Sequence, residues 1–372
     1  MTQITRYGMI GCGMMGQEHL KNIALLPDTM VAAIYEPDAD MRAIAAQLAP
    51  DAAFCQSVDD LLMRDDLDCL VIVSPNHMHL SQLEAISATK HRPILVEKPL
   101  FTSIDDIDRV VQFQENYSAP VWVAMEYRYM PPITALAQDL TGAVGDLKMI
   151  SIREHRFPFL EKVGDWNRFN QNSGGTFVEK CCHFFDLMRV LTESDPVRIM
   201  ATGGQAVNHL DEVYDGRPSD IWDHGYVIVD FANGQRAMLE LCMFAEGSRY
   251  QEEISAVGSK GKIEALVPGP TRFWPVDSLG APPTPKVIES PRDPKGPIER
   301  DIPVDPALLA AGDHNGSTFY QHQKFLDVVR NGTCPEVGLI DGIWAVRMGQ
   351  AAQLSAQTGQ SVTFDMGWAT KF

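Results

Sequence analysis

The chain has 372 residues, of which 45% are hydrophobic and 22% are charged, and its formal net charge at pH 7 is −18. This length exceeds what one hydrophobic core usually supports, so we expect a globular protein of two domains. The negative charge argues against nucleic acid and against an anionic membrane as partners, because both are bound through clustered Lys and Arg.

The cysteines and the amino terminus favour a cytoplasmic protein. Seven cysteines are an odd number and form no Cys-x-x-Cys pair, so we expect reduced thiols. Residues 1–7 are polar and lack a secretory apolar stretch, and no run reaches the roughly 18 apolar residues of a membrane span. Cys181 and Cys182 would point about 100° apart on a helix, so we expect no metal site.

Between residues 5 and 125, short apolar runs alternate with helical patterns. The runs are too short and too branched for helices, and they cover residues 7–10, 30–35, 69–73, 94–96 and 121–124. The helical patterns cover residues 16–26, 40–48, 59–63, 79–89 and 104–115. This alternation predicts the α/β class, with a doubly wound parallel sheet of the Rossmann type in an NAD-binding domain over residues 1–126.

Successive strands dominate the second part of the chain. We expect strands at 147–155, 197–205, 226–231, 236–244, 251–257, 262–265 and 361–364, and helices at 175–191, 317–330 and 341–358. They predict an α+β domain over 127–372 with a large open, mainly antiparallel sheet, whose 341–358 helix packs back towards the first domain. Eleven of the 24 prolines fall between Pro268 and Pro306, which predicts an irregular excursion there.

The first predicted strand leads into a helix through a glycine-rich turn. The turn consists of Gly11, Cys12, Gly13, Met14, Met15 and Gly16. Such glycines let backbone amides approach a pyrophosphate at the helix amino terminus. Glu36 ends the second strand, where a carboxylate binds the adenosine ribose and repels a 2′-phosphate. The pattern predicts NAD, with NADP less favoured because it would need a basic neighbour.

Two later strand ends carry polar residues that should border the nicotinamide, because ligands of doubly wound sheets bind at the carboxyl ends of the strands. These residues are Ser74, Asn76, His79, Glu97 and Lys98. In a partly dry cleft the charged form of a lysine is disfavoured, which would suit Lys98 to relay a proton. The alternative is that Lys98 pairs with a carboxylate at a strand end.

The second domain contains a glycine-helix-histidine motif over residues 173–186. On one helix, Glu179 and Lys180 lie four and three residues before His183, so all three can share a face. Glu179 would then fix the tautomer of His183 and raise its basicity. Lys98, His183 and Glu179 are therefore the predicted catalytic residues, and the alternative is a structural core histidine.

Over essentially its whole length the chain resembles the Gfo/Idh/MocA family of glucose-fructose oxidoreductases, inositol dehydrogenases and rhizopine-catabolism proteins. The resemblance is carried by the glycine-rich turn, Glu97-Lys98-Pro99, Gly174-Gly175 with His183, and the closing helix. It implies a substrate between the domains, Lys98 and His183 as the catalytic pair, and a homodimer or homotetramer built on the second-domain sheet. The family usually has Asp where this chain has Glu179.

The resemblance implies chemistry on carbohydrates. We expect an NAD-dependent oxidoreductase that moves hydride between nicotinamide and a hydroxyl carbon of a sugar, sugar derivative or inositol. The alternative is an NAD-dependent glycoside hydrolase acting by transient oxidation and elimination, for example on a sulfonated sugar. A cofactor-binding regulator without turnover would not need both Lys98 and His183.

Further polar and aromatic residues in the expected cleft are candidate substrate contacts. Besides Lys98, Lys180 and His183, they are Tyr127, Arg128, His155, Arg156, Trp166, Asn167 and His314. Convergence of Arg156, Arg168 and Lys180 would favour a substrate bearing a carboxylate, phosphate or sulfonate.

Overall fold

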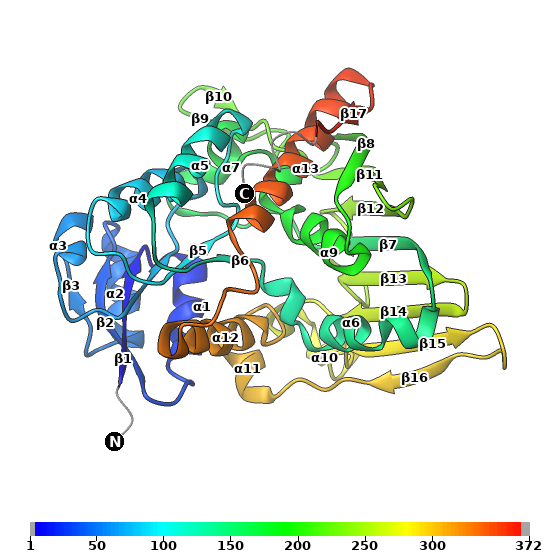
Figure 1. Ribbon diagram of the computed structural model, residues 1–372, viewed down its shortest axis with the longest axis horizontal. Helices are drawn as coiled ribbons and strands as arrows, with labels where there is room; N and C mark the ends of the chain where they lie inside the picture. Colours follow the sequence, from blue (N-terminus) through cyan, green and yellow to red (C-terminus); the bar gives the residue numbers. More distant parts are fainter. Residues whose placement is uncertain (1–3, 366–372) are drawn as a thin grey trace.

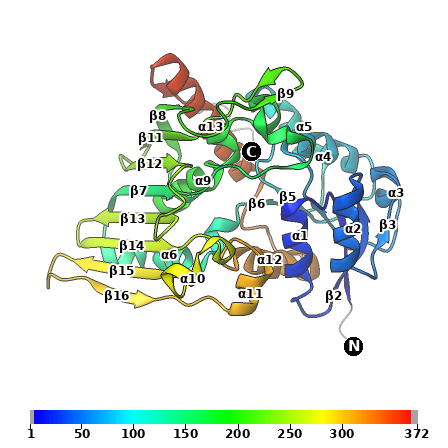
Figure 2. The same cartoon turned by 180° about the vertical axis from the view of Figure 1, so that it is seen from behind.

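The computed structural model describes residues 4–365, which form two large sheets at opposite sides of the molecule and a small two-stranded sheet of β9 (Val213–Tyr214) and β10 (Arg217–Pro218). In both Figure 1 and Figure 2 the N-terminal parallel sheet lies at one side and the larger sheet at the other. Helices α9 (Cys182–Thr192) and α12 (Ser317–Asn331) lie between them, and α6 (Pro131–Val144) packs on the larger sheet.

Six parallel strands form the N-terminal sheet, in the order β3-β2-β1-β4-β5-β6. They are β1 (Thr5–Ile10), β2 (Thr29–Tyr35), β3 (Ala53–Phe54), β4 (Cys69–Ile72), β5 (Ile94–Glu97) and β6 (Val121–Ala124). The helices between them are α1 (Met14–Ile23), α2 (Ala39–Leu48), α3 (Val58–Leu62), α4 (His79–Ser87) and α5 (Ile107–Asn116). Every residue of β4, β5 and β6 is buried, as in parallel strands covered on both faces. The predicted doubly wound sheet is confirmed, and its strand order reverses beside β1, where such sheets bind ligands.

Nine strands form the second sheet, in the order β16-β15-β14-β13-β7-β12-β11-β8-β17. They are β7 (Leu147–His155), β8 (Pro196–Gly204), β11 (His224–Phe231), β12 (Arg236–Cys242), β13 (Glu252–Gly258), β14 (Gly261–Val267), β15 (Lys286–Pro291), β16 (Ile298–Asp301) and β17 (Val362–Thr363). All neighbours are antiparallel except β7 and β12, so the mainly antiparallel sheet is confirmed.

The proline-rich segment was expected to be irregular and to hold no regular ladder, and this prediction is wrong for the two strands that it contains. Residues 286–291 and 298–301 form β15 and β16, which extend the sheet beyond β14. The prolines interrupt no ladder, because they lie in the connections or, like Pro291, at the end of a strand. The outermost strand, β16, needs hydrogen-bond donors on one side only.

The helix expected over residues 175–191 is broken in two. Helix α8 (Thr176–Glu179) ends before Lys180, and α9 begins at Cys182. The side-chain amine of Lys98 donates to the carbonyl of Glu179 at 2.9 Å, at the point of the break. The Glu179 carboxylate then pairs with Lys162 at 3.2 Å, and the Lys180 amine donates to the Tyr127 hydroxyl at 2.6 Å.

The last long helix, α13 (Leu339–Thr358), contributes side chains to the cores of both sheets. Ile343 and Val346 pack with the N-terminal core, whereas Trp344 and Met348 pack with the second. Glycines permit this close packing: a Cβ on Gly349 would lie 2.7 Å from the carbonyl oxygen of Phe177. Over residues 4–365, the helices include none that combines the length and apolar character needed to cross a membrane.

Candidate active site

The glycine-rich turn leaves room for a pyrophosphate at the amino terminus of α1. Gly11 has φ +91°, and a Cβ there would lie 2.7 Å from the carbonyl oxygen of Val73. A Cβ on Gly13 would meet nothing within 4 Å, so the space in front of the helix is open. The first turn of α1 has no acidic residue and no side-chain cap, which leaves its amides to an anion. These residues fit a dinucleotide.

Glu36 lies beside this turn at the end of β2. Its carboxylate accepts hydrogen bonds from the backbone N–H of Cys12 at 2.5 Å and of Asp38 at 2.9 Å. The carboxylate is therefore held against the turn, where the adenosine ribose of a dinucleotide lies.

The residues after β4 shape the edge of the sheet. Ser74 Oγ donates to Gln82 Oε1 at 2.6 Å, and Asn76 Nδ2 donates to the carbonyl of Ser173 at 3.3 Å. The ring nitrogens of His79 lie 2.8 Å and 2.9 Å from the backbone oxygens of Pro99 and Ser74. The fully buried His79 therefore ties two strand ends together and does not present its ring to a cofactor.

Lys98 follows β5 and approaches the second domain, with its amine bonded to the Glu179 carbonyl. Burial by itself lowers the pKa of Lys98, but Cys182 and the carboxylates of Glu126, Glu97 and Glu179 outweigh burial and raise the pKa. The expectation that a dry cleft would disfavour the charged form is therefore wrong, because the carboxylates surround the amine. At neutral pH Lys98 is an ammonium and a hydrogen-bond donor.

His183, on α9, stacks on Tyr127 with ring centroids 4.1 Å apart and an interplanar angle of 5°. Tyr127 belongs to the 3₁₀ helix η3 (Glu126–Tyr129), which follows β6. Burial lowers the pKa of His183 well below its usual value, and Lys98 and Lys180 lower it further. The imidazole is neutral, and its Nε2 lies 3.6 Å from Oε1 of Glu126.

Lys180 faces the covered side of the second sheet. Its amine donates to the hydroxyl of Tyr127 at 2.6 Å and lies 2.8 Å from Oε1 of Glu154 on β7. Glu252 and Arg156 act on the same amine, and burial, the largest influence, lowers the pKa of Lys180. This cluster fixes Tyr127, on which the His183 ring stacks.

His314 completes the group from the segment before α12. Its Nδ1 lies 2.8 Å from Oε1 of Glu18 on α1, and its ring centroid is 6.1 Å from that of Tyr127. Burial opposes the charged imidazole, but Glu18 outweighs burial and raises the pKa of His314 to about 9. His314 therefore carries a positive charge at neutral pH.

The family is identified by two matching family models. The model for an oxidoreductase family with an NAD-binding Rossmann fold matches residues 5–125, and the model for the C-terminal alpha/beta domain of that family matches residues 139–364. The chain belongs to the Gfo/Idh/MocA oxidoreductase family. The predicted resemblance is confirmed, and with it an NAD(P)-binding Rossmann domain in an oxidoreductase.

Two curated relatives and one solved structure illustrate the family likeness of this oxidoreductase. The inositol 2-dehydrogenase of Rhizobium meliloti (strain 1021) is 26% identical over 70% of this chain and 75% of its own. The myo-inositol 2-dehydrogenase of Thermotoga maritima is 23% identical over 97% of this chain and 98% of its own. A levoglucosan dehydrogenase, solved with NADH and levoglucosan, has the same fold, with a TM-score of 0.76 at 19% identity over 96% of this chain and 99% of that chain.

Glu179 does not contact His183 in this oxidoreductase. Its Oε1 lies 3.2 Å from the amine of Lys162, and its backbone carbonyl is the acceptor for Lys98. The expected carboxylate–imidazole pair on one helix face is wrong because α8 ends at Glu179. The carboxylate nearest His183 is Glu126.

Two other expected substrate contacts turn away from the site. The guanidinium of Arg128 donates to both carboxylate oxygens of Asp186 on α9. Arg128 follows Tyr127 on η3, and the side chains of neighbouring helical residues point in different directions. His155 pairs with Glu240 on the open face of the second sheet, at 3.0 Å. Strand alternation puts its neighbour Glu154 on the covered face instead. Neither Arg128 nor His155 fits a substrate-binding role.

The loop before the glycines is only partly as expected. Trp166 lies against His77, with ring centroids 6.2 Å apart, and beneath the amine of Lys162, so it borders the interdomain region. Asn167 is buried and donates to the carbonyl of Leu160, which holds the loop together. Arg168 is paired with Glu212. Its guanidinium does not converge with Arg156 and Lys180, so the argument for an anionic substrate fails.

Sequence reasoning missed the carboxylates of the site: Glu18, Glu126, Glu154 and Glu252. Glu154 carried a usable signal, because it shares a strand face with the apolar Ile150 and Ile152. Glu126 carried a weaker one, as an acidic residue directly after a buried strand. Glu18 and Glu252 became recognisable only through their partners from distant segments.

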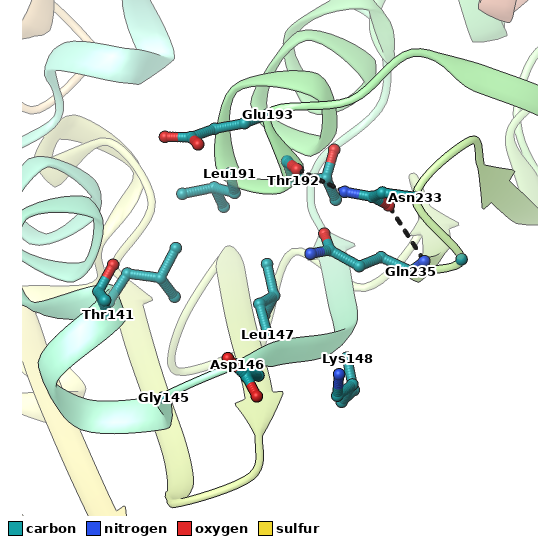
Figure 3. Close-up of a pocket in the computed structure, with 12 residues that line it drawn as sticks. Thr141, Gly145, Asp146, Leu147, Lys148, Leu191, Thr192, Glu193, Asn233 and Gln235 are labelled. Carbon is teal, nitrogen blue, oxygen red and sulfur yellow. Dashed lines mark hydrogen bonds between the residues drawn. The ribbon is translucent and has the colours of Figure 1, made fainter.

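A cavity of about 370 Å³ lies away from these residues, at the carboxyl ends of α6 and α9. Figure 3 shows Asp146, Lys148, Glu193 and Gln235 around it, with a hydrogen bond from the Gln235 backbone to Asn233. None of the residues that line this cavity belongs to the group around Lys98 and His183. Among residues 4–365, no group of three or more His, Cys, Asp or Glu side chains is arranged to hold a metal ion.

Proposed function

We propose that this protein is an NAD-dependent dehydrogenase of a neutral sugar, sugar derivative or inositol. One observation above all supports this function: the Lys98 ammonium, the neutral His183 ring and the Glu126 carboxyl meet where β5 and β6 end against α9. This combination can stabilise an alkoxide and carry away a hydroxyl proton, which oxidation of an alcohol requires.

The dinucleotide would be held by the turn at Gly11 and Gly13 and by Glu36. When bound, NAD supplies the acceptor for the hydride. Glu36 favours NAD over NADP because a buried carboxylate repels the 2′-phosphate of NADP. Asp38, which follows closely, adds a second negative charge to this corner. Arg42 is a nearby cation, and its guanidinium donates to the carbonyl of Pro37.

Lys98 and His183 would have different roles in the transfer of the hydroxyl proton. The Lys98 ammonium would donate to the reacting oxygen and stabilise its developing negative charge. His183 is neutral and stacked in place by Tyr127, so it can accept the hydroxyl proton. The proximity of Lys98 and His183 to the expected nicotinamide edge supports their assignment as the catalytic pair.

The charges around the site favour a neutral polyol. Lys180 lies against Glu154, Arg168 lies against Glu212, and His314 is bonded to Glu18. These cations are therefore matched by carboxylates of the chain itself. The names of the two curated relatives, both inositol dehydrogenases, agree with a polyhydroxylated ring as substrate.

The deciding experiment is an absorbance screen at 340 nm with NAD or NADP. The panel contains free sugars, inositols, anhydrosugars, sugar acids, sulfosugars and aryl glycosides. We expect NADH to form with a neutral sugar or inositol, and Lys98→Ala to lower kcat by about 10²- to 10⁴-fold because the alkoxide loses its cation. Lys148→Ala, on the second sheet, is the matched control.

The aryl glycosides test the alternative function. Release of the aglycone without net NADH would show a redox-neutral glycoside hydrolase and would overturn the dehydrogenase. If protein that binds NADH forms no NADH and releases no aglycone with any compound of the panel, both the dehydrogenase and the glycoside hydrolase are overturned.

We also propose that the open face of the second sheet joins copies of this chain as a homodimer or homotetramer. Helices α6, α9 and α13 pack on the opposite face, while exposed apolar side chains lie on the open one. They include Met149, Tyr226 and Ile228. Apolar residues on a broad sheet face are typical of subunit interfaces.

A further inference from the structure

Glu126 has the geometry of a proton acceptor: it is buried, with 1% of its surface exposed, and its carboxylate makes no hydrogen bond within the described residues 4–365. A buried carboxylate without partners costs free energy, so such a group is retained where a substrate, a water or a proton completes it. Its nearest ion-pair partner is Nε2 of His183, at 3.6 Å.

We propose that Glu126, acting through His183, receives the proton that leaves the substrate hydroxyl. This inference rests on the proposed dehydrogenase function and adds a residue to its site. Glu126 is a positioning residue and a proton store, and the structure assigns to it the carboxylate role that the sequence had suggested for Glu179.

The proton and electron movements balance through the imidazole ring. The substrate O–H bond breaks as an N–H bond forms at Nε2 of His183, which lies 3.6 Å from Oε1 of Glu126; that N–H bond then breaks as an O–H bond forms on Glu126. A dinucleotide held at Gly11 and Gly13 would supply the oxidised nicotinamide as acceptor for the hydride and its two electrons. The ring ends neutral, as it began, and the reaction's proton resides on the carboxyl.

Neighbouring groups make Glu126 the suitable acceptor. Lys98 already carries its proton, and the buried His183 does not retain one. Burial, with a smaller contribution from Glu97, raises the pKa of Glu126 to about 7 against the opposing effects of His314 and Lys98. A carboxyl with this pKa can gain and lose a proton near neutral pH.

Three segments bring titratable groups to Glu126. Glu97 and Lys98 belong to the end of β5, Cys182 and His183 to α9, and His314 to the segment before α12. Cys182 is a thiol at neutral pH, because burial raises its pKa to about 12. The charged neighbours are thus one carboxylate and two cations.

The first test is an infrared pH titration of the full-length protein, with and without NADH and without substrate. The protonated carboxyl C=O stretch reports each neutral carboxyl. We expect two buried carboxyls to titrate near pH 7, because burial also raises the pKa of Glu252 to about 7. Glu126→Gln should remove one signal and Glu252→Gln the other. If Glu126→Gln leaves both signals, the proposal is overturned.

The second test is the pH profile of kcat with the best substrate from the screen. We expect wild-type kcat to rise about 10-fold from pH 6 to pH 8, as Glu126 becomes ready to accept a proton. Glu126→Gln should lower kcat at least 10-fold and abolish the rise, while Glu126→Asp should retain a rise at a lower rate. Glu84→Gln, at the surface on α4, controls for loss of a carboxylate.

The two tests separate the failure of this inference from the failure of the function. An inert panel overturns the dehydrogenase, but the infrared titration still decides whether Glu126 exchanges protons near pH 7. An active enzyme whose pH profile survives Glu126→Gln, at whatever rate, leaves Glu126 a purely structural residue and overturns the inference.

Discussion

Lys98 and His183 are neighbours that burial affects in the same direction, yet the pKa of Lys98 rises and that of His183 falls. The difference lies in their partners. Carboxylates surround the lysine, whereas His183 faces the charges of Lys98, Lys180 and His314. Lys98 is therefore a fixed hydrogen-bond donor that suits an alkoxide, and the neutral His183 beside it is an acceptor that suits the proton.

The cofactor preference can be tested at Glu36. Glu36→Gln keeps the shape of the side chain but removes the charge that opposes a 2′-phosphate. We expect kcat/KM with NAD to fall about 10-fold, because charged hydrogen bonds contribute about 1.5–3 kcal/mol. The ratio of kcat/KM with NAD to kcat/KM with NADP should fall at least about 10-fold as well. Glu84→Gln, which removes an exposed carboxylate on α4, is the control. An unchanged preference in Glu36→Gln would place the adenosine ribose elsewhere.

The Glu18–His314 pair predicts a pH dependence of stability. His314 has a raised pKa, about 9, so its contribution is complete below its unfolded value near 6.5 and is lost as the pH rises through 9. Glu18 has a pKa lowered to about 2, because His314 outweighs the opposing effect of burial. Its contribution is complete above its unfolded pKa near 4.3 and is lost as the pH falls towards 2.

The measurement is urea unfolding of wild type and Glu18→Gln between pH 5 and pH 9.5. The difference in free energy of unfolding should be largest at pH 5–6.5 and shrink steadily towards pH 9. The exposed Glu84–Arg109 pair provides the control, since Glu84→Gln should show no such trend. A constant difference across this range would mean that His314 is uncharged.

At the scale of elements, local signals predicted the parallel sheet and the glycine turn because both depend on neighbouring residues. The break between α8 and α9 was not predictable in this way, since the Lys98 amine that bonds the Glu179 carbonyl comes from a distant strand end. Glu179 pairs with Lys162, and the carboxylate next to His183 is that of Glu126. Glu154, by contrast, was within reach of strand alternation.

Two helical glycines test how closely α13 must approach α8. A Cβ on Gly349 would lie 2.9 Å from the Cα of Val178, in backbone that cannot easily move, whereas one on Gly142 of α6 would meet nothing within 4 Å. We expect Gly349→Ala to destabilise the protein by about 1–3 kcal/mol. Gly142→Ala should stabilise it by about 0.5–1 kcal/mol, because alanine favours the helix. Urea unfolding compares them, and equal effects would contradict this packing.

For the whole molecule, α13 joins the two sheets, because successive residues of this helix enter different cores. The catalytic candidates come from both sides of this junction. Lys98 and Glu126 follow strands of the first sheet, and His183 lies on a helix that packs under the second. The distance between the ammonium and the imidazole therefore depends on the junction as a whole.

The open face of the second sheet carries the last prediction. Ile228 is 44% exposed and pairs directly with Met200 on β8 and Met238 on β12, so it lies in an apolar row across three strands. If copies associate through this face, Ile228→Lys buries a charge against another subunit and should shift the light-scattering mass towards 41.2 kDa, the mass of one chain. Met63→Lys, on the first domain, should leave the mass unchanged. Because the covered face of β7, the strand next to β12, holds Glu154 beside Lys180, dissociation should also lower kcat if the interface keeps the sheet rigid. An oligomer that survives Ile228→Lys would place the interface on another surface.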